Sequence, residues 1–109
     1  MSKVARDDLI FKALADSRRR EILDLLRDAP RTTGALCEHF AASLDRCTVM
    51  QHIGVLQKAE LVIAVREGRT RWNYLNAAPI QEIRDRWLSP YSVEAVGVLT
   101  RLKRDLEGT

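Results

Sequence analysis

Apolar residues recur three and four positions apart through the first half of the chain, which is the spacing of one helix face. Asp16 or Ser17 stands before the second run, and Asp45 stands before the fourth. Their side chains can accept hydrogen bonds from the free N–H groups of a first helical turn. The pattern predicts four helices, at Val4–Ala15, Arg18–Arg27, Gly34–Phe40 and Arg46–Ala59.

The period then changes from helical spacing to the composition of β-strands. Leu61–Val65 and Arg71–Leu75 are β-rich, and Glu67-Gly68 between them is typical of a turn, so the three segments predict a hairpin. A fifth helix is expected over Pro79–Leu88, and Ser89-Pro90 then indicates the start of a final helix or a kink.

This order predicts a winged helix-turn-helix fold, mainly α with a small β-hairpin. The chain of 109 residues fits one domain over 1–109. Residues 33–59 form its helix-turn-helix and 61–76 its wing. The segments 1–15 and 78–109 are predicted to be dimerisation helices, because so short a chain has few elements to cover their apolar stripes. The expected interface residues are Leu9, Ile10, Leu14, Tyr91, Leu99, Leu102 and Leu106.

Composition limits the possible classes of protein but does not identify a function. The formal net charge is +3, which permits nucleic-acid binding without requiring it. No apolar run approaches the roughly 20 residues of a membrane span, and the N-terminus does not resemble a secretory signal, so a cytoplasmic protein without a membrane partner is expected.

The predicted fourth helix has two different faces. At 100° per residue, Val49, Ile53 and Leu56 form a buried stripe, while Gln51 and Gly54 lie on the opposite side. A glutamine amide can bond to the edge of a base, most naturally adenine. The residues of this helix expected to contact DNA are Arg46, Cys47, Thr48, Gln51 and His52. The alternatives are a solvated polar face and, for His52, a packing role.

The hairpin tip is rich in arginine. Arg66, Arg69 and Arg71 fall within six residues, and such a tip can lie along a phosphate backbone or enter a minor groove. The alternative is a charged turn that keeps an edge strand soluble.

Three arginines, Arg18–Arg20, occupy the first turn of the second helix, where the helix dipole disfavours cations. Structural ion pairs are expected here, and phosphate contact is the alternative. The candidate partners are Asp16, Glu21 and Asp24. In the same helix the predicted buried stripe is Ile22, Leu25 and Leu26.

Three stretches, IFKALADSRRREILDLL, TVMQHIGVLQKAELV and REGRTRWNYLN, together resemble the ArsR/SmtB family of winged-helix repressors. The similarity covers about Leu9 to Trp87. It implies a homodimer formed by the first and last helices, and repression by occupation of a double-stranded DNA operator. The chain departs from the family in having Ser17 where a proline is frequent.

The metal sites of that family are not expected here. Alignment places Thr32 and Gly34 where one site type has cysteines, and residues 79–106 hold no histidine. Cys37 and His39 supply two ligands, fewer than zinc needs. No metal or cofactor is therefore predicted.

Redox control, binding of another protein and catalysis are the alternatives to simple DNA binding. Cys47, beside Arg46 in a first helical turn, leaves redox control of DNA binding open, while Cys37 is expected to be a buried thiol. A winged helix that binds another protein is a second alternative, and the arginine-rich tip argues against it. Catalysis is not expected, because no nucleophile–base pair, carboxylate dyad or phosphate loop is present.

Overall fold

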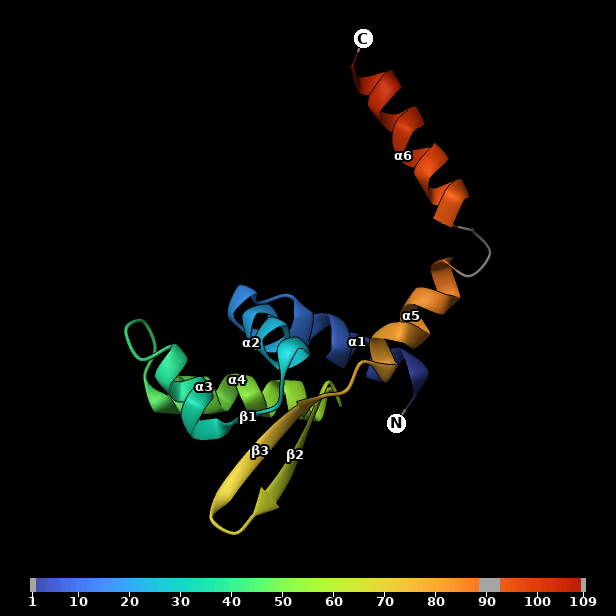
Figure 1. The fold of residues 1–109 in the computed structure, drawn as a ribbon. Helices are drawn as coiled ribbons and strands as arrows, with labels where there is room; N and C mark the ends of the chain where they lie inside the picture. Colours follow the sequence, from blue (N-terminus) through green and yellow to red (C-terminus); the bar gives the residue numbers. More distant parts are fainter. Residues whose placement is uncertain (1, 89–92, 109) are drawn as a thin grey trace. The chain divides into compact units, whose positions relative to one another are not determined.

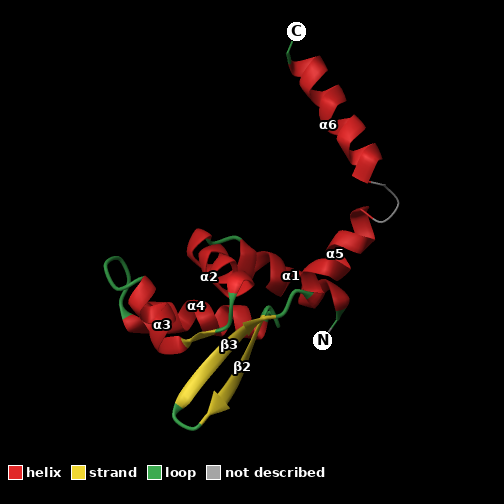
Figure 2. Ribbon diagram, viewed as in Figure 1, coloured by secondary structure: helices red, strands yellow, loops and turns green. Residues whose placement is uncertain are grey.

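A computed structural model describes residues 2–88 and 93–108 of the chain. Within it the chain forms two compact units, Met1–Pro79 and Ile80–Thr109. The first unit contains four helices and a small sheet (Figures 1 and 2). Its elements in chain order are α1 (Lys3–Leu14), α2 (Ser17–Asp28), β1 (Arg31–Thr32), α3 (Thr33–His39), α4 (Arg46–Lys58), β2 (Val62–Glu67) and β3 (Thr70–Leu75). They are followed by α5 (Ala78–Leu88) and α6 (Val93–Glu107).

Each of the first four helices begins where a short polar side chain satisfies its free N–H groups. The Ser2 hydroxyl accepts from the N–H of Ala5, and the Asp16 carboxylate accepts from Arg18 at 2.8 Å. The Thr32 hydroxyl accepts from Ala35 at 3.0 Å. The order of the helices and the hairpin confirms the predicted winged helix-turn-helix fold. Each of the first five helices lies within two residues of its predicted position, and the predicted start at Ser89-Pro90 lies outside the described residues.

The core of the first unit collects apolar side chains from all four of its helices and from β2. Its members that are less than 5% exposed are Ala13, Ile22, Leu26, Leu36, Val49, Ile53, Leu56, Leu61 and Val62. In α2 the buried stripe is Ile22, Leu23 and Leu26, whereas Leu25 is only half-buried. The prediction that Leu25 belongs to the buried stripe is therefore wrong. Helix α2 packs against α1, α4 and β3, and this surrounding, rather than the ideal periodicity of α2, selects Leu23.

The sheet has three strands in the order β1-β3-β2, all antiparallel. The two-residue strand β1 was not predicted. It pairs with β3 through Arg31 opposite Asn73 and Thr32 opposite Trp72. Two residues carry no detectable strand pattern, so only the approach of β3 from a distant part of the chain makes this segment a strand. Its pairing joins the base of the hairpin to the start of α3.

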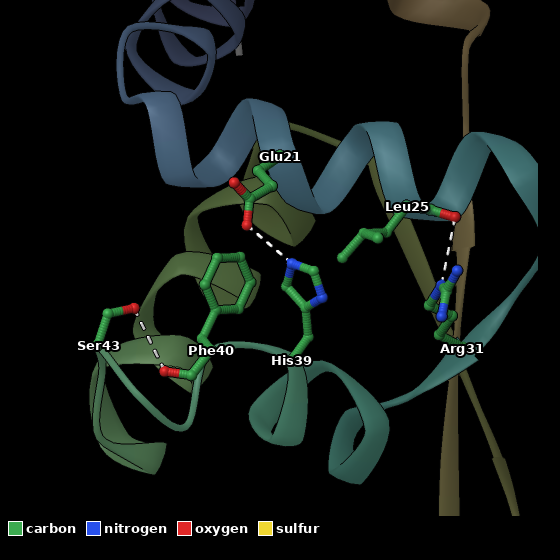
Figure 3. A network of polar contacts seen from close by, with 6 residues as sticks. All are labelled: Glu21, Leu25, Arg31, His39, Phe40 and Ser43. Atoms are coloured by element: carbon green, nitrogen blue, oxygen red, sulfur yellow. Dashed lines mark hydrogen bonds and ion pairs between the residues drawn. The ribbon is translucent and has the colours of Figure 1, made fainter.

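Helix α3 is also held by α2. The imidazole Nε2 of His39 lies 2.9 Å from the Glu21 carboxylate, and the Arg31 guanidinium donates to the Leu25 carbonyl at 3.4 Å (Figure 3). The Phe40 ring packs edge-on against the His39 ring, with centroids 4.8 Å apart. The His39–Glu21 contact places the first helix of the helix-turn-helix relative to α2.

The residue that follows the C-cap of helix α4 has an unfavourable backbone conformation. Glu60 has φ of 61°, in the left-handed region, and follows the capping residue Ala59. The N–H of Leu61 donates to the Leu56 carbonyl at 2.9 Å, as in a Schellman motif. Glycine is the residue this position favours, because a Cβ is strained there.

Replacement of Glu60 by glycine is therefore expected to stabilise the protein by about 0.5–1 kcal/mol, since relief of strain exceeds the added entropy of the unfolded chain. Urea unfolding followed by circular dichroism measures the change. Glu60→Ala, which also removes the carboxylate but keeps a Cβ, is expected to give no such gain. Equal stabilisation by both variants would mean that the side chain, and not the backbone conformation, is unfavourable.

Candidate nucleic-acid interface

The first part of the candidate interface is helix α4, which has one buried and one exposed face. Asp45 caps it by accepting from the N–H of Thr48 at 2.7 Å, and this hydrogen bond lowers the pKa of the carboxyl group. Val49, Ile53 and Leu56 are buried, which confirms the predicted stripe. The side chains opposite to them consequently point away from the core of the unit.

The exposed face of α4 is mostly polar near its N-terminal end. Arg46, Cys47 and Gln51 are exposed, and Thr48 is half-buried. At Gly54 an added Cβ would meet no atom within 4 Å. A glycine inside a helix costs about 0.5–1 kcal/mol relative to alanine. The described chain therefore leaves the space beside Gly54 open.

The wing is the second part. Strands β2 and β3 extend away from the helices as a hairpin (Figure 1), and Gly68 at its tip has φ of 63°, as the first position of a type II′ turn requires. The register places Arg66 directly opposite Arg71. Like charges opposite each other are destabilising in a sheet unless an anion lies between or beside them.

An open cleft of about 530 Å³ lies between the wing and the helix-turn-helix. Its lining is basic and hydroxyl-rich, and comprises Thr32, Thr33, Gly34, Arg46, Met50, Arg66, Arg69, Thr70 and Arg71. Over residues 2–88 and 93–108, no acidic side chain forms an ion pair with any of these four arginines. Guanidinium groups form charge-assisted hydrogen bonds with phosphate oxygens, so the chemistry of this lining suits an anion. The structure thus brings together Arg46 of α4 and the three predicted wing arginines.

Asn73 fixes the wing relative to α3, and this residue was missed from the sequence. It is fully buried, and its amide nitrogen donates to the Arg31 carbonyl at 3.2 Å and to the Thr33 hydroxyl at 3.1 Å. Its amide oxygen is buried without a partner among the described residues. The available signal was its inward register in β3, but a sequence alone does not show what an inward polar residue bonds to.

His52 lies on the flank of α4 and is half-buried. Its Nδ1 is 3.3 Å from the Arg19 guanidinium. Arg19 also donates to two carbonyls of α1, and Arg20 donates to the Leu14 carbonyl at 2.6 Å. The hydrogen-bond partners of Arg19 and Arg20 are therefore backbone oxygens at the end of α1, whose last carbonyls lack helical partners. The pKa of the predicted partner Asp16 is lowered mainly by the hydrogen bond from the Arg18 N–H, and the positive charge of Arg19 contributes to the same shift.

The residues predicted for a dimer interface differ in exposure. Ile10 is only 6% exposed and belongs to the core of its own unit, which leaves little of it for a partner. Leu9 and Leu14 are half-buried. In the second unit Leu99, Leu102 and Leu106 are 53%, 51% and 70% exposed. Tyr91 lies outside the described residues.

The cysteines do not pair with each other, and Cys47 is exposed while Cys37 is half-buried rather than buried. Within the described residues no group of three or more histidine, cysteine or acidic side chains is placed to hold a metal ion. No helix in the described part of the chain is long and apolar enough to cross a membrane.

A helix-turn-helix followed by an arginine-bearing hairpin defines a winged helix-turn-helix protein. The model of a family described as "Helix-turn-helix domain" matches residues 14–65. The transcriptional repressor SdpR of Bacillus subtilis is 34% identical over 73 residues, which cover 67% of this chain and 79% of that protein. The chain belongs to the ArsR family of helix-turn-helix transcriptional regulators.

Two further relatives agree with this placement. The arsenical resistance operon repressor of Staphylococcus aureus is 39% identical over 74 residues, which cover 68% of this chain and 69% of that protein. The solved structure of an ArsR-like transcriptional regulator from Rhodococcus sp. RHA1 aligns with a TM-score of 0.70 at 26% identity, over 100% of this chain and 99% of that one. The chain is accordingly a DNA-binding transcriptional regulator.

Proposed function

We propose that this protein represses transcription by binding a palindromic operator as a homodimer. Helix α4 lies in the major groove and contacts base edges, and the wing arginines hold the flanking phosphates. The observation that carries the proposal is the cleft in which Arg46, Arg66, Arg69 and Arg71 gather beside the exposed face of α4. The repressor names of two relatives support the direction of regulation.

The division of labour follows from the side chains on each element. Gln51 is exposed and offers a donor and an acceptor to a base edge, whereas arginines at the wing bind phosphate oxygens of any sequence. Gly54 on the same helix face leaves the backbone open to close approach. Specificity is therefore assigned to α4 and salt-dependent affinity to the wing.

Gln51→Ala is expected to weaken binding to the operator by about 1–3 kcal/mol, and binding to random duplex by much less. The operator is first selected from random duplexes with the wild-type protein, and fluorescence anisotropy then measures both affinities at one salt concentration.

Gln57→Ala is the matched control, because Gln57 is a half-buried glutamine near the C-terminal end of the same helix. It is expected to leave the ratio of operator to random affinity unchanged. Equal losses of affinity on both duplexes for Gln51→Ala would show that Gln51 does not contact bases. Failure to select any operator would overturn the proposed function.

A further inference from the structure

Arg19 joins three helices through a single guanidinium group. Its Nε donates to the Ala13 carbonyl at 2.8 Å and one terminal nitrogen donates to the Lys12 carbonyl at 2.9 Å, both at the end of α1. The other terminal nitrogen lies 3.3 Å from Nδ1 of His52 on α4. Arg19 itself belongs to the first turn of α2, and these three helices pack against one another. The planar fork of arginine suits such a fixed set of acceptors.

The contact with α4 has a defined direction. A guanidinium group has donors only, so Arg19 is the donor of this hydrogen bond and Nδ1 of His52 its acceptor.

His52 lies between the exposed Gln51 and the buried Ile53. Successive residues of a helix differ by about 100° in direction, so a force that fixes the direction of His52 also fixes that of Gln51. The buried stripe determines which face of α4 meets the core, through apolar packing that is itself non-directional. Arg19 supplies a directional bond at the flank of the helix.

We propose that Arg19 is a positioning residue for base recognition, which fixes the rotation of α4 about its axis by holding His52 against the end of α1. The inference rests on the proposed function of α4 as the recognition helix.

The test compares Arg19→Ala, His52→Ala and the double variant on the selected operator and on random duplex, at a temperature where circular dichroism shows each variant folded. Each single change is expected to weaken operator binding about tenfold and random binding by less than about twofold. The double variant is expected to be no weaker than either single variant, because both remove the same bond.

Two further variants separate positioning from stability. His52→Asn keeps an acceptor near the place of Nδ1 and is expected to restore most operator affinity. Arg20→Ala is the matched control, since Arg20 bonds the Leu14 carbonyl of α1 and has no bond to α4 among the described residues. It is expected to lower the melting temperature and to leave the ratio of operator to random affinity unchanged. Additive losses in the double variant, or equal losses on both duplexes, overturn the inference and assign Arg19 to phosphate contact or to folding.

A measurement without DNA distinguishes failure of this inference from failure of the proposed function. Long-range nitrogen–proton NMR at about pH 8.5, where an ordinary imidazole is neutral, is expected to show His52 protonated on Nε2. The amide signals of Gln51 and Gly54 are expected to shift in Arg19→Ala and not in Arg20→Ala. A proton on Nδ1, or unchanged α4 signals, would overturn the inference even if the protein binds its operator.

Discussion

A variant with Leu99→Glu and Leu102→Glu is expected to be monomeric and to lose tight operator binding. Both side chains are about half exposed on α6. Each lies three or four residues from other apolar residues of this helix, so these side chains share one helix face. Water-exposed leucines in this number are unfavourable, and a two-fold interface would bury the whole stripe at once. Two carboxylates placed in that interface would be desolvated without partners.

The loss on DNA is expected to be large because a dimer contacts two half-sites about one helical turn apart, roughly 10–10.5 base pairs or a multiple of it. A monomer retains one half-site, so operator affinity should fall by about a thousandfold or more, toward the affinity for random duplex. Sedimentation equilibrium measures the change in assembly, and fluorescence anisotropy measures the change in affinity.

Arg101→Glu is the control for charge, because it changes the net charge by the same amount on the opposite face of α6. It is expected to leave the protein dimeric. A wild-type protein that is monomeric at micromolar concentration and still binds a palindrome tightly would contradict the proposed assembly. A double variant that is unfolded by circular dichroism would instead show that the second unit needs this face to fold.

The second large effect is expected at the wing. Replacement of Arg69 and Arg71 by alanine should weaken binding to every duplex and reduce the slope of log affinity against log salt by about one to two. At 0.1 M salt this corresponds to a loss of about tenfold to a hundredfold. The physical reason is that both arginines line the cleft beside Arg46 without a carboxylate partner in the described chain, so each is available to displace a counterion from DNA.

The control variant carries Arg69→Lys and Arg71→Lys, which keeps both charges. It is expected to keep the salt slope, because the slope depends on the number of neutralised phosphates. Titrations at four or more salt concentrations with operator and random duplex provide the comparison. An unchanged slope in the alanine variant would exclude the wing from the interface and leave α4 as the sole contact.

Local chemistry explains which parts of this protein could be predicted. Asp16, Thr32 and Asp45 each cap a helix with their own side chain, and the turn at Gly68 needs the positive φ of a glycine. These interactions join residues a few positions apart, so the sequence contains both partners side by side. The order of the helices, the hairpin and the exposed position of Gln51 on α4 follow from them.

The tertiary structure alone decided the features that depend on distant residues. Strand β1 exists because β3 pairs with it, and the buried amide of Asn73 donates to the backbone carbonyl of Arg31, 42 residues away. Arg19 bonds to His52 across 33 residues. A guanidinium group has many acceptors within reach of its own helix, and only packing of α1, α2 and α4 selects among them. The sequence by itself therefore determined the elements and their exposed faces, whereas the cleft and the bonds that orient those faces required the fold, because their energies arise from contacts that no local pattern contains.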